Sequence, residues 1–160
     1  MTIQVGDKLP SATLKVARAD GIQDVGTDEI FRGKKVVVFG LPGAFTPTCS
    51  AKHLPGFVQK ADAIRARGVD AIVCLSVNDA FVMGAWAKDQ QVGDRIVMLA
   101  DGNAEWSRAL GLEFDGQRFG MGTRCQRFAM IVEDGVVRAL HVEAPGRFEV
   151  SSAEAMLAAL

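Results

Sequence analysis

One cysteine of this chain occupies a position that favours reactivity. Residues 36–41 form an apolar, β-branched run typical of a buried strand, and residues 42–49 follow it directly. Pro47 suits the first turn of a helix, where no backbone N–H is needed, and Thr46 is then the expected N-cap. Cys49 falls inside that first turn, where unpaired N–H groups and the helix dipole favour an anion. We therefore expect a thiolate to be stabilised at this position.

The alternative is that Cys49 is an ordinary core residue, because cysteine is among the residue types most often buried. The other cysteines, Cys74 and Cys125, are far apart in the sequence, and no Cys-x-x-Cys pair is present. The pattern argues against a thioredoxin-type dithiol, a general thiol–disulfide exchanger and a zinc knuckle. His53 and His141 are the only histidines, and their spacing predicts no metal site. His53, one turn beyond Cys49, is either a pocket residue or an ordinary histidine of the helix surface.

Length and charge narrow the class of protein. The 160 residues fit a single domain, residues 1–160. The net charge of −1 gives no reason to expect nucleic acid or an anionic membrane as a partner. No apolar stretch approaches the roughly 20 residues of a membrane span, and the N-terminal residues lack the basic and apolar regions of a signal peptide. We therefore expect a cytoplasmic protein, in a compartment where structural disulfides are uncommon.

The strand pattern predicts the architecture. Apolar, β-branched runs and one Asp-Gly turn predict the main strands at residues 35–41, 69–77, 95–100, 125–133 and 136–142. Helical segments separate the first three strands, so these should be parallel, whereas the last two form an antiparallel hairpin. The order predicts an α/β domain with a mixed central β-sheet and helices on both faces.

Three local signals refine this picture. Pro55 predicts a kink or a break near Leu54 in the helix that follows Cys49. The glycine-rich residues 113–122 are expected to form a loop. Ser151 is the expected cap of a final helix.

Longer segments extend the Cys49 motif. The first reads Leu41-Pro42-Gly43-Ala44-Phe45-Thr46-Pro47-Thr48-Cys49-Ser50, and the second reads His53-Leu54-Pro55-Gly56-Phe57. Together they resemble the active-site segment of the peroxiredoxins, most closely that of the type-five, or type-II, group. Residues 74–82 and 127–130 resemble the same group, and the resemblance covers essentially the whole chain. It implies a thioredoxin-like fold and reduction of peroxides by a cysteine thiol, with no metal and no organic cofactor.

The resemblance assigns roles to four residues. Cys49 matches the peroxidatic cysteine, the nucleophile that is oxidised to a sulfenic acid. Thr46 would orient the peroxide, and Pro42 would shield the thiolate from water. Arg127 matches the family arginine, which would stabilise the thiolate and the charge that develops on the leaving oxygen. Strand alternation places Arg124 on the face opposite to Arg127, so we expect only one of the two to reach Cys49.

The resolution of the sulfenic acid is less well defined. Many type-five members use a second cysteine near the C-terminus, and this chain has none after Cys125. Cys74 matches a resolving cysteine of some plant-like members, but it lies in a predicted core strand, where an inert thiol is the simpler interpretation. Cys125 shares a predicted strand face with Arg127. We therefore expect an external thiol, either glutathione with glutaredoxin or else thioredoxin.

The expected function is a thiol peroxidase for hydrogen peroxide and small alkyl hydroperoxides. The alternative is a redox sensor or a chaperone-like binding protein that signals through oxidation of Cys49. Turnover with a recycling thiol separates these two classes. Type-five members commonly form homodimers, and the aromatic residues expected at such a contact are Phe45, Phe81 and Trp86.

Overall fold

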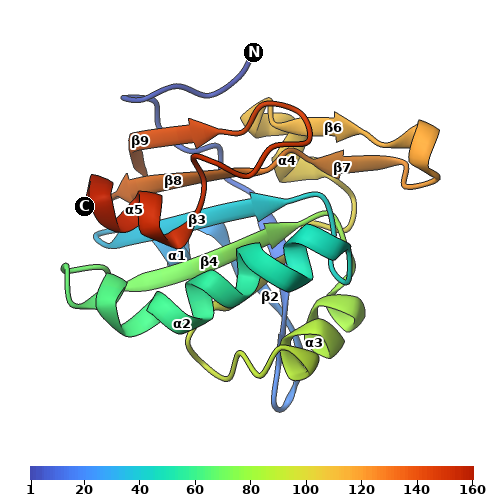
Figure 1. The fold of residues 1–160 in the computed structure, drawn as a ribbon. Coiled ribbons are helices and arrows are strands. Elements are labelled where there is room, and N and C mark those ends of the chain that lie inside the picture. Colours follow the sequence, from blue (N-terminus) through green and yellow to red (C-terminus); the bar gives the residue numbers. More distant parts are fainter.

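The computed structural model describes residues 1–160, and a seven-stranded mixed sheet lies at its centre (Figure 1). The order of the strands is β2-β1-β5-β4-β3-β8-β9. Their bounds are β1 (Thr13–Arg18), β2 (Gly21–Gly26), β3 (Lys35–Leu41), β4 (Ala71–Ser76), β5 (Val97–Ala100), β8 (Phe128–Glu133) and β9 (Val136–Val142). The three central strands β3, β4 and β5 are parallel, and every other pairing in the sheet is antiparallel. The predicted mixed sheet is therefore confirmed.

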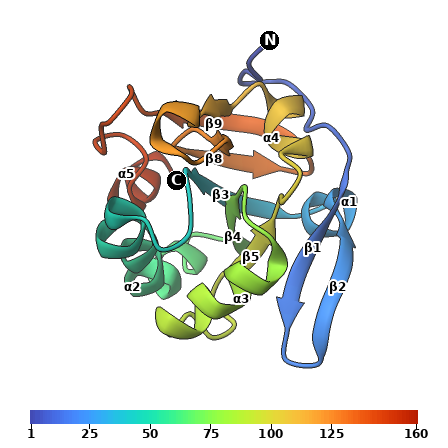
Figure 2. The same ribbon diagram turned by 90° about the vertical axis from the view of Figure 1, so that its right-hand side faces the viewer.

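Helices cover both faces of this sheet (Figure 2). One face packs against α2 (Leu54–Arg65), α3 (Ala80–Asp89) and α5 (Ala153–Ala159), and the other against α1 (Thr27–Phe31) and α4 (Glu105–Leu110). Alternation along the strands divides the core, so that Phe39 and Cys74 belong to the first layer and Val38 and Leu75 to the second. None of the helices is long and apolar enough to cross a lipid bilayer.

The strand predicted at residues 125–133 is interrupted. A two-stranded sheet is formed by β6 (Glu113–Asp115) and β7 (Thr123–Cys125), joined by the 3₁₀ turn η2 (Gln117–Phe119), where only a loop was expected. The chain then changes partner, because β7 pairs with β6 whereas β8 pairs with β3. Arg127 lies in the short break between these two pairings, which frees its side chain from strand alternation.

The helix that carries Cys49 is continuous, so no break occurs near Leu54, and the irregularity there is a wider helical turn instead. Helical residues run from Pro47 to the end of α2, with a π-helical turn, η1, at Cys49–His53. The N–H of Leu54 bonds to the carbonyl of Cys49, five residues back. Pro55 has no N–H to donate, so a wider turn just before it keeps the helix intact.

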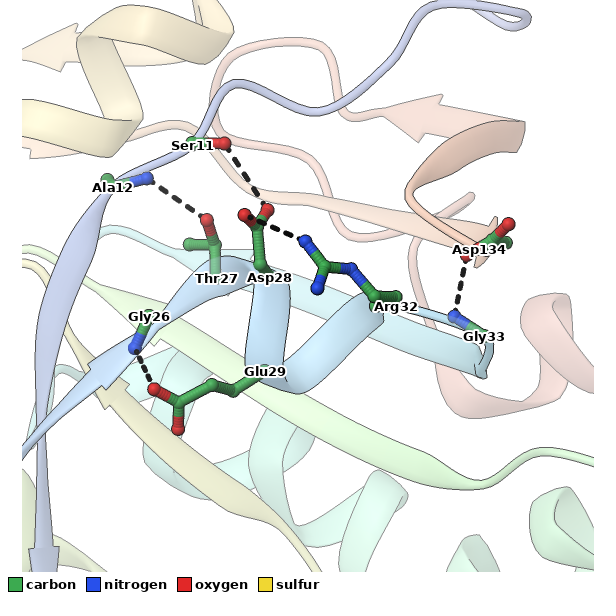
Figure 3. A network of polar contacts seen from close by, with 9 residues as sticks. All are labelled: Ser11, Ala12, Gly26, Thr27, Asp28, Glu29, Arg32, Gly33 and Asp134. Carbon is green, nitrogen blue, oxygen red and sulfur yellow. Dashed lines mark hydrogen bonds and ion pairs between the residues drawn. The ribbon is translucent and has the colours of Figure 1, made fainter.

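A polar network around α1 holds the segment that leads into β3 (Figure 3). Within it, Thr27 accepts from the Ala12 N–H at 3.0 Å, and the Glu29 carboxylate accepts from the Gly26 N–H at 3.4 Å. Asp28 pairs with Ser11 and Arg32, and the Gly33 N–H donates to Asp134 at 2.6 Å. The last contact ties the turn before β3 to the β8–β9 turn. It therefore helps to set the register of the strands that bring Cys49 and Arg127 together.

Candidate active site

The segment that joins β3 to the Cys49 helix is held by Asn78. The Asn78 Oδ1 atom accepts from the Ala44 N–H at 2.9 Å and from the Ser76 hydroxyl at 2.5 Å. Phe45 adopts a left-handed backbone conformation with φ of +63°, which is uncommon for an aromatic residue. This turn directs the chain into the helix that begins at Pro47.

Arg124 braces the same segment. Its Nη1 donates to the Pro42 carbonyl at 3.2 Å, and its Nε donates to the Met121 carbonyl at 2.9 Å. A Cβ on Gly43 would lie 2.5 Å from this Nη1, so a larger residue at position 43 would displace the guanidinium of Arg124. The expectation that only one of the two arginines reaches Cys49 is confirmed, although strand alternation is not the reason, because Arg127 lies outside both β7 and β8. Only Arg127 contacts the sulfur.

Arg127 and the start of the helix surround the sulfur of Cys49. The Arg127 Nη2 atom donates to Cys49 Sγ at 3.1 Å. The backbone N–H groups of Thr48 and Cys49, in the first helical turn, have no acceptor within the protein. Cys49 itself is fully buried. A guanidinium and the positive end of a helix therefore act on a sulfur that is shielded from water, and both favour a negative charge there.

Thr46 immediately precedes the helix, as predicted, but its hydroxyl does not cap it. The hydroxyl donates to the Gly43 carbonyl at 2.7 Å, while the Thr46 carbonyl accepts from the Ser50 N–H at 2.9 Å. Because the hydroxyl hydrogen is committed to Gly43, the oxygen offers its lone pairs to a donor. This side chain can therefore accept a hydrogen bond from a bound molecule.

His53 is fully buried, so the interpretation as a surface histidine is wrong. Its Nδ1 accepts from Arg127 Nη1 at 2.8 Å, and its Nε2 donates to the Ser151 carbonyl at 2.9 Å. Burial, reinforced by the charge of Arg127, lowers the pKa of His53 to about 3. The π-helical turn places the ring where it links Arg127 to the segment before α5.

Sequence reasoning missed Glu143, which follows β9. Its carboxylate accepts the Ser151 hydroxyl at 2.7 Å and the N–H groups of Glu149, Val150 and Ser151. Burial would raise the pKa of Glu143, but these hydrogen bonds outweigh it and hold the pKa below its usual value. Because Ser151 is engaged in this way, the cap of α5 is Ser152, whose hydroxyl accepts from the Ala155 N–H at 3.1 Å. No motif in the sequence marks the contact between Glu143 and residues 149–151.

The other two cysteines occupy different surroundings. Cys74 lies fully buried in β4, in the same core layer as Cys49, and burial raises the pKa of its thiol well above the usual value. Cys125 lies in the other layer, and burial raises its pKa to about 12. The predicted strand face shared by Cys125 and Arg127 is thus wrong. All three cysteines are free thiols.

A cavity of about 850 Å³ opens beside the site. Its wall is formed by the start of the Cys49 helix, the β6–β7 region and the chain after β9, and it includes Pro42, Thr46, Pro47, Thr48, Phe114, Phe119, Arg127 and Glu143. Cys49 does not line it, so the sulfur lies behind the cavity wall. No three His, Cys, Asp or Glu side chains are grouped so that they could hold a metal ion.

Comparison with known proteins identifies the family. The Redoxin family model matches residues 4–157. Peroxiredoxin-2E-2, chloroplastic, of Oryza sativa subsp. japonica is 54% identical over 164 residues, which cover 99% of this chain and 73% of the relative. Peroxiredoxin-2B of Arabidopsis thaliana is 46% identical and covers 99% of this chain and 98% of its own. This chain belongs to the peroxiredoxin family. Within it, these relatives place the chain in the type-II subfamily.

Solved peroxiredoxin structures share the whole architecture. Reduced Prx3 from Vibrio vulnificus, in complex with hydrogen peroxide, superimposes with a TM-score of 0.95 at 53% identity, covering 99% of both chains. Oxidised Prx3 of the same organism gives a TM-score of 0.90 at 55% identity, covering 100% of both chains. The thioredoxin-like fold implied by the sequence is confirmed. As a peroxiredoxin, the protein is a thiol-dependent peroxidase, an oxidoreductase.

Proposed function

We propose that Cys49 is the peroxidatic nucleophile and that it reduces hydrogen peroxide and small alkyl hydroperoxides. The thiolate attacks one oxygen of the peroxide, so that an S–O bond forms while the O–O bond breaks. The sulfur loses two electrons and becomes a sulfenic acid, and the leaving oxygen takes up a proton to give water or an alcohol. The observation that carries this assignment is the 3.1 Å contact from Arg127 Nη2 to the Cys49 sulfur.

Three neighbours divide the work of holding the peroxide. Arg127 stabilises the thiolate and the charge that develops on the leaving oxygen. The Thr46 oxygen, whose own hydrogen is donated to Gly43, accepts the O–H of the attacked oxygen and sets its direction. Pro42 excludes water from the thiolate. Alignment of both oxygens with the sulfur then supplies most of the acceleration, because a well-stabilised thiolate is a weaker nucleophile.

The cavity gives the peroxide its route to Cys49. Pro42, Thr46 and Arg127 belong to its wall, and the buried sulfur lies behind them. A small displacement of these side chains therefore exposes the sulfur to a bound peroxide. That reduced Prx3 of Vibrio vulnificus was crystallised with hydrogen peroxide in a fold of TM-score 0.95 supports the same substrate here.

An external thiol recycles the enzyme in this proposal. Cys74 and Cys125 are both fully buried, with pKa values raised by burial, so neither presents a thiolate to the sulfenic acid. A first thiol condenses with the sulfenic acid to give a mixed disulfide and water. A second thiol then releases Cys49 as the free thiol and leaves as the other half of a disulfide. Glutathione with glutaredoxin, or thioredoxin, has the chemistry for these two steps.

A homodimer and a cytoplasmic location complete the proposal. Two of the aromatic residues named for the dimer contact are exposed, Phe45 by 53% and Phe81 by 77%. The prediction for Trp86 is wrong, because this residue is fully buried. Exposed aromatic side chains close to the Cys49 segment support a contact between two copies. Sedimentation that yields only monomers at every working concentration would refute the dimer.

The test is peroxide consumption with each recycling system, glutathione with glutaredoxin and thioredoxin, assayed in parallel. Continued turnover supports the peroxidase, whereas a single oxidation event that then stops supports the redox sensor. Intact-mass measurement after one equivalent of peroxide tests the recycling step. A gain of one oxygen supports an external thiol, and a loss of two hydrogens would show an internal disulfide and refute it.

A further inference from the structure

Residues 144–151 lie between β9 and α5, and several of their polar groups donate to one buried carboxylate, that of Glu143. We call this segment the C-terminal loop; it is the red connection between β9 and α5 in Figure 1. Glu143 Oε2 accepts from the Val150 N–H at 2.8 Å, the Ser151 N–H at 2.8 Å and the Ser151 hydroxyl at 2.7 Å. The Glu149 N–H lies 2.9 Å from both carboxylate oxygens. A carboxylate with this many donors is held in place, and it holds the donors in turn.

Ser151 connects the Glu143 carboxylate to His53. The Ser151 carbonyl can only accept a hydrogen bond, so His53 Nε2 must carry a proton. Arginine can only donate, so His53 Nδ1 must present a lone pair to Arg127 Nη1 at 2.8 Å. The two partners together permit one form of the ring, the neutral Nε2–H tautomer. The lowered pKa of His53 agrees with that form.

Two further contacts connect Glu143 to Arg127. The Glu143 N–H donates to the Arg127 carbonyl at 2.9 Å, which fixes the backbone that carries the guanidinium. Phe148, in the C-terminal loop, lies over both side chains of the pair. Its ring centroid is 5.0 Å from that of His53 and 5.8 Å from Arg127 Cζ. Through Phe148, the C-terminal loop thus packs against the His53 ring and the Arg127 guanidinium. The Glu143 carboxylate in turn fixes the loop.

We propose that Glu143 is a positioning residue for peroxide reduction: through Ser151 it fixes the tautomer of His53, and through His53 it aims the Arg127 guanidinium at the Cys49 sulfur. The proposal rests on the proposed function for its kinetic consequence but not for its structural one. Arg127 presents one Nη group to His53 and the other to the sulfur, so a ring that turned or changed tautomer would release one end of the guanidinium. Glu143 touches neither the sulfur nor its arginine partner through its own side chain.

The competing explanation is that Glu143 only stabilises the C-terminal loop. The two explanations differ in what happens at His53. Loss of a mere anchor lowers the free energy of unfolding but leaves the ring and the guanidinium as they are. Loss of a positioning residue changes the tautomer of His53 and the rate at which Cys49 is oxidised, even where the protein remains folded.

The experiment compares Glu143→Gln with wild type and with Glu154→Gln. A glutamine at position 143 turns an amide NH₂ toward backbone N–H donors and so loses part of the cluster. Glu154 is an exposed carboxylate three residues beyond the loop, so its substitution removes the same charge elsewhere. The first readout is the rate constant for oxidation of Cys49 by hydrogen peroxide in single turnover, which excludes the recycling thiol. The second is the nitrogen-15 NMR signature of the His53 ring at neutral pH.

We expect wild type and Glu154→Gln to show the neutral Nε2–H tautomer and equal rates. In Glu143→Gln we expect a mixture of ring forms and a rate lower by about tenfold to hundredfold, the loss typical of a displaced catalytic group. An unchanged tautomer and rate in folded Glu143→Gln would overturn the proposal, as would a lower rate with an unchanged tautomer. Should this variant fail to fold, Ser151→Ala, which removes one donor, carries the test with a smaller expected loss.

Failure of the proposed function gives a different result. If wild type does not react with peroxide at Cys49, the peroxidase assignment falls. The NMR comparison then still decides whether Glu143 sets the state of His53, because that readout requires no turnover.

Discussion

Cys49 and Cys74 lie in the same apolar layer, and both are fully buried, yet their polar surroundings differ. Cys49 lies in the first turn of a helix and receives a hydrogen bond from Arg127 at 3.1 Å, whereas Cys74 lies in the middle of the central sheet, where burial raises the pKa of its thiol well above the usual value. Burial alone therefore does not decide whether a cysteine reacts. In the proposed function, the features that distinguish Cys49 are the positive charge of Arg127 and the free backbone N–H groups, both of which favour a thiolate in a site that excludes water.

The largest expected effect comes from exchanging sulfur for oxygen at each position. Cys49→Ser should abolish peroxide consumption, since an alcohol at this position forms no sulfenic acid. Cys74→Ser should retain it, because nothing in the surroundings of Cys74 favours the thiolate. Peroxide consumption with a recycling thiol measures both variants, and Cys125→Ser is the matched control from the opposite core layer. A Cys49→Ser protein that still turns over, paired with an inactive Cys74→Ser protein, would reverse the comparison.

The next effect tests the charge that separates the two cysteines. Arg127→Lys keeps one positive charge but loses the planar group that reaches His53 and the sulfur together. We expect the rate constant for Cys49 oxidation to fall by about 10² to 10³, the usual cost of removing one donor to a developing charge. Arg138→Lys, at an exposed position of β9, is the control and should leave the rate unchanged. A rate equal to wild type in Arg127→Lys would mean that charge alone, without geometry, activates the sulfur.

The central strands and the surroundings of Cys49 also show what the sequence can predict. The strands β3, β4 and β5 were evident because long apolar runs leave little choice of structure, and Cys49, Thr46 and Arg127 were evident from one local motif and one matching arginine. The break at Arg127 was not evident, because β7 and β8 are distinguished only by their partners β6 and β3.

The outer part of the site was hidden for a related reason. His53 and Ser151 are 98 residues apart in the chain, and only the folded sheet brings them together. A lone glutamate such as Glu143, outside any motif, is indistinguishable in the sequence from a surface charge. Local pattern thus identifies the groups that touch the sulfur, and tertiary structure alone identifies the groups that hold them.

A smaller effect should appear in the pH dependence of stability. The pKa of His53 is about 3 in the folded protein against 6.5 for the unfolded reference, so below pH 6.5 the unfolded chain binds a proton that the folded protein excludes. The contribution of neutral His53 to the free energy of unfolding is complete above pH 6.5 and is lost as the pH falls toward 3. Glu143, whose pKa is lowered from 4.5, adds a loss in the same direction only below about pH 4.5. The interval between pH 6.5 and 5 therefore reports on His53.

Denaturant unfolding of wild type and His53→Gln measures this contribution. Between pH 6.5 and 5 the free energy of unfolding of wild type should fall by about 1.5 kcal/mol more than that of the variant. The variant will be less stable at both values, so only the difference in slope matters. Parallel curves would show that His53 is not held neutral in the folded protein, and they would contradict the hydrogen bond that its Nδ1 accepts from Arg127.

The smallest effect is optical and extends the comparison to the two faces of the sheet. Trp86 packs in the layer of Cys49, and its indole N–H donates to the Ser50 hydroxyl at 3.1 Å, one residue from the sulfur. Trp106 packs in the other layer and donates to the Pro10 carbonyl at 2.8 Å. Oxidation of Cys49 inserts an oxygen into a packed site, so the helical turn at Cys49–His53 must shift and disturb the hydrogen bond of Trp86. The Trp106→Phe variant retains Trp86, so its tryptophan fluorescence should change when peroxide is added. The Trp86→Phe variant retains only Trp106, and its fluorescence should not change. An equal response of both variants would mean that oxidation is felt across the whole sheet rather than in one layer.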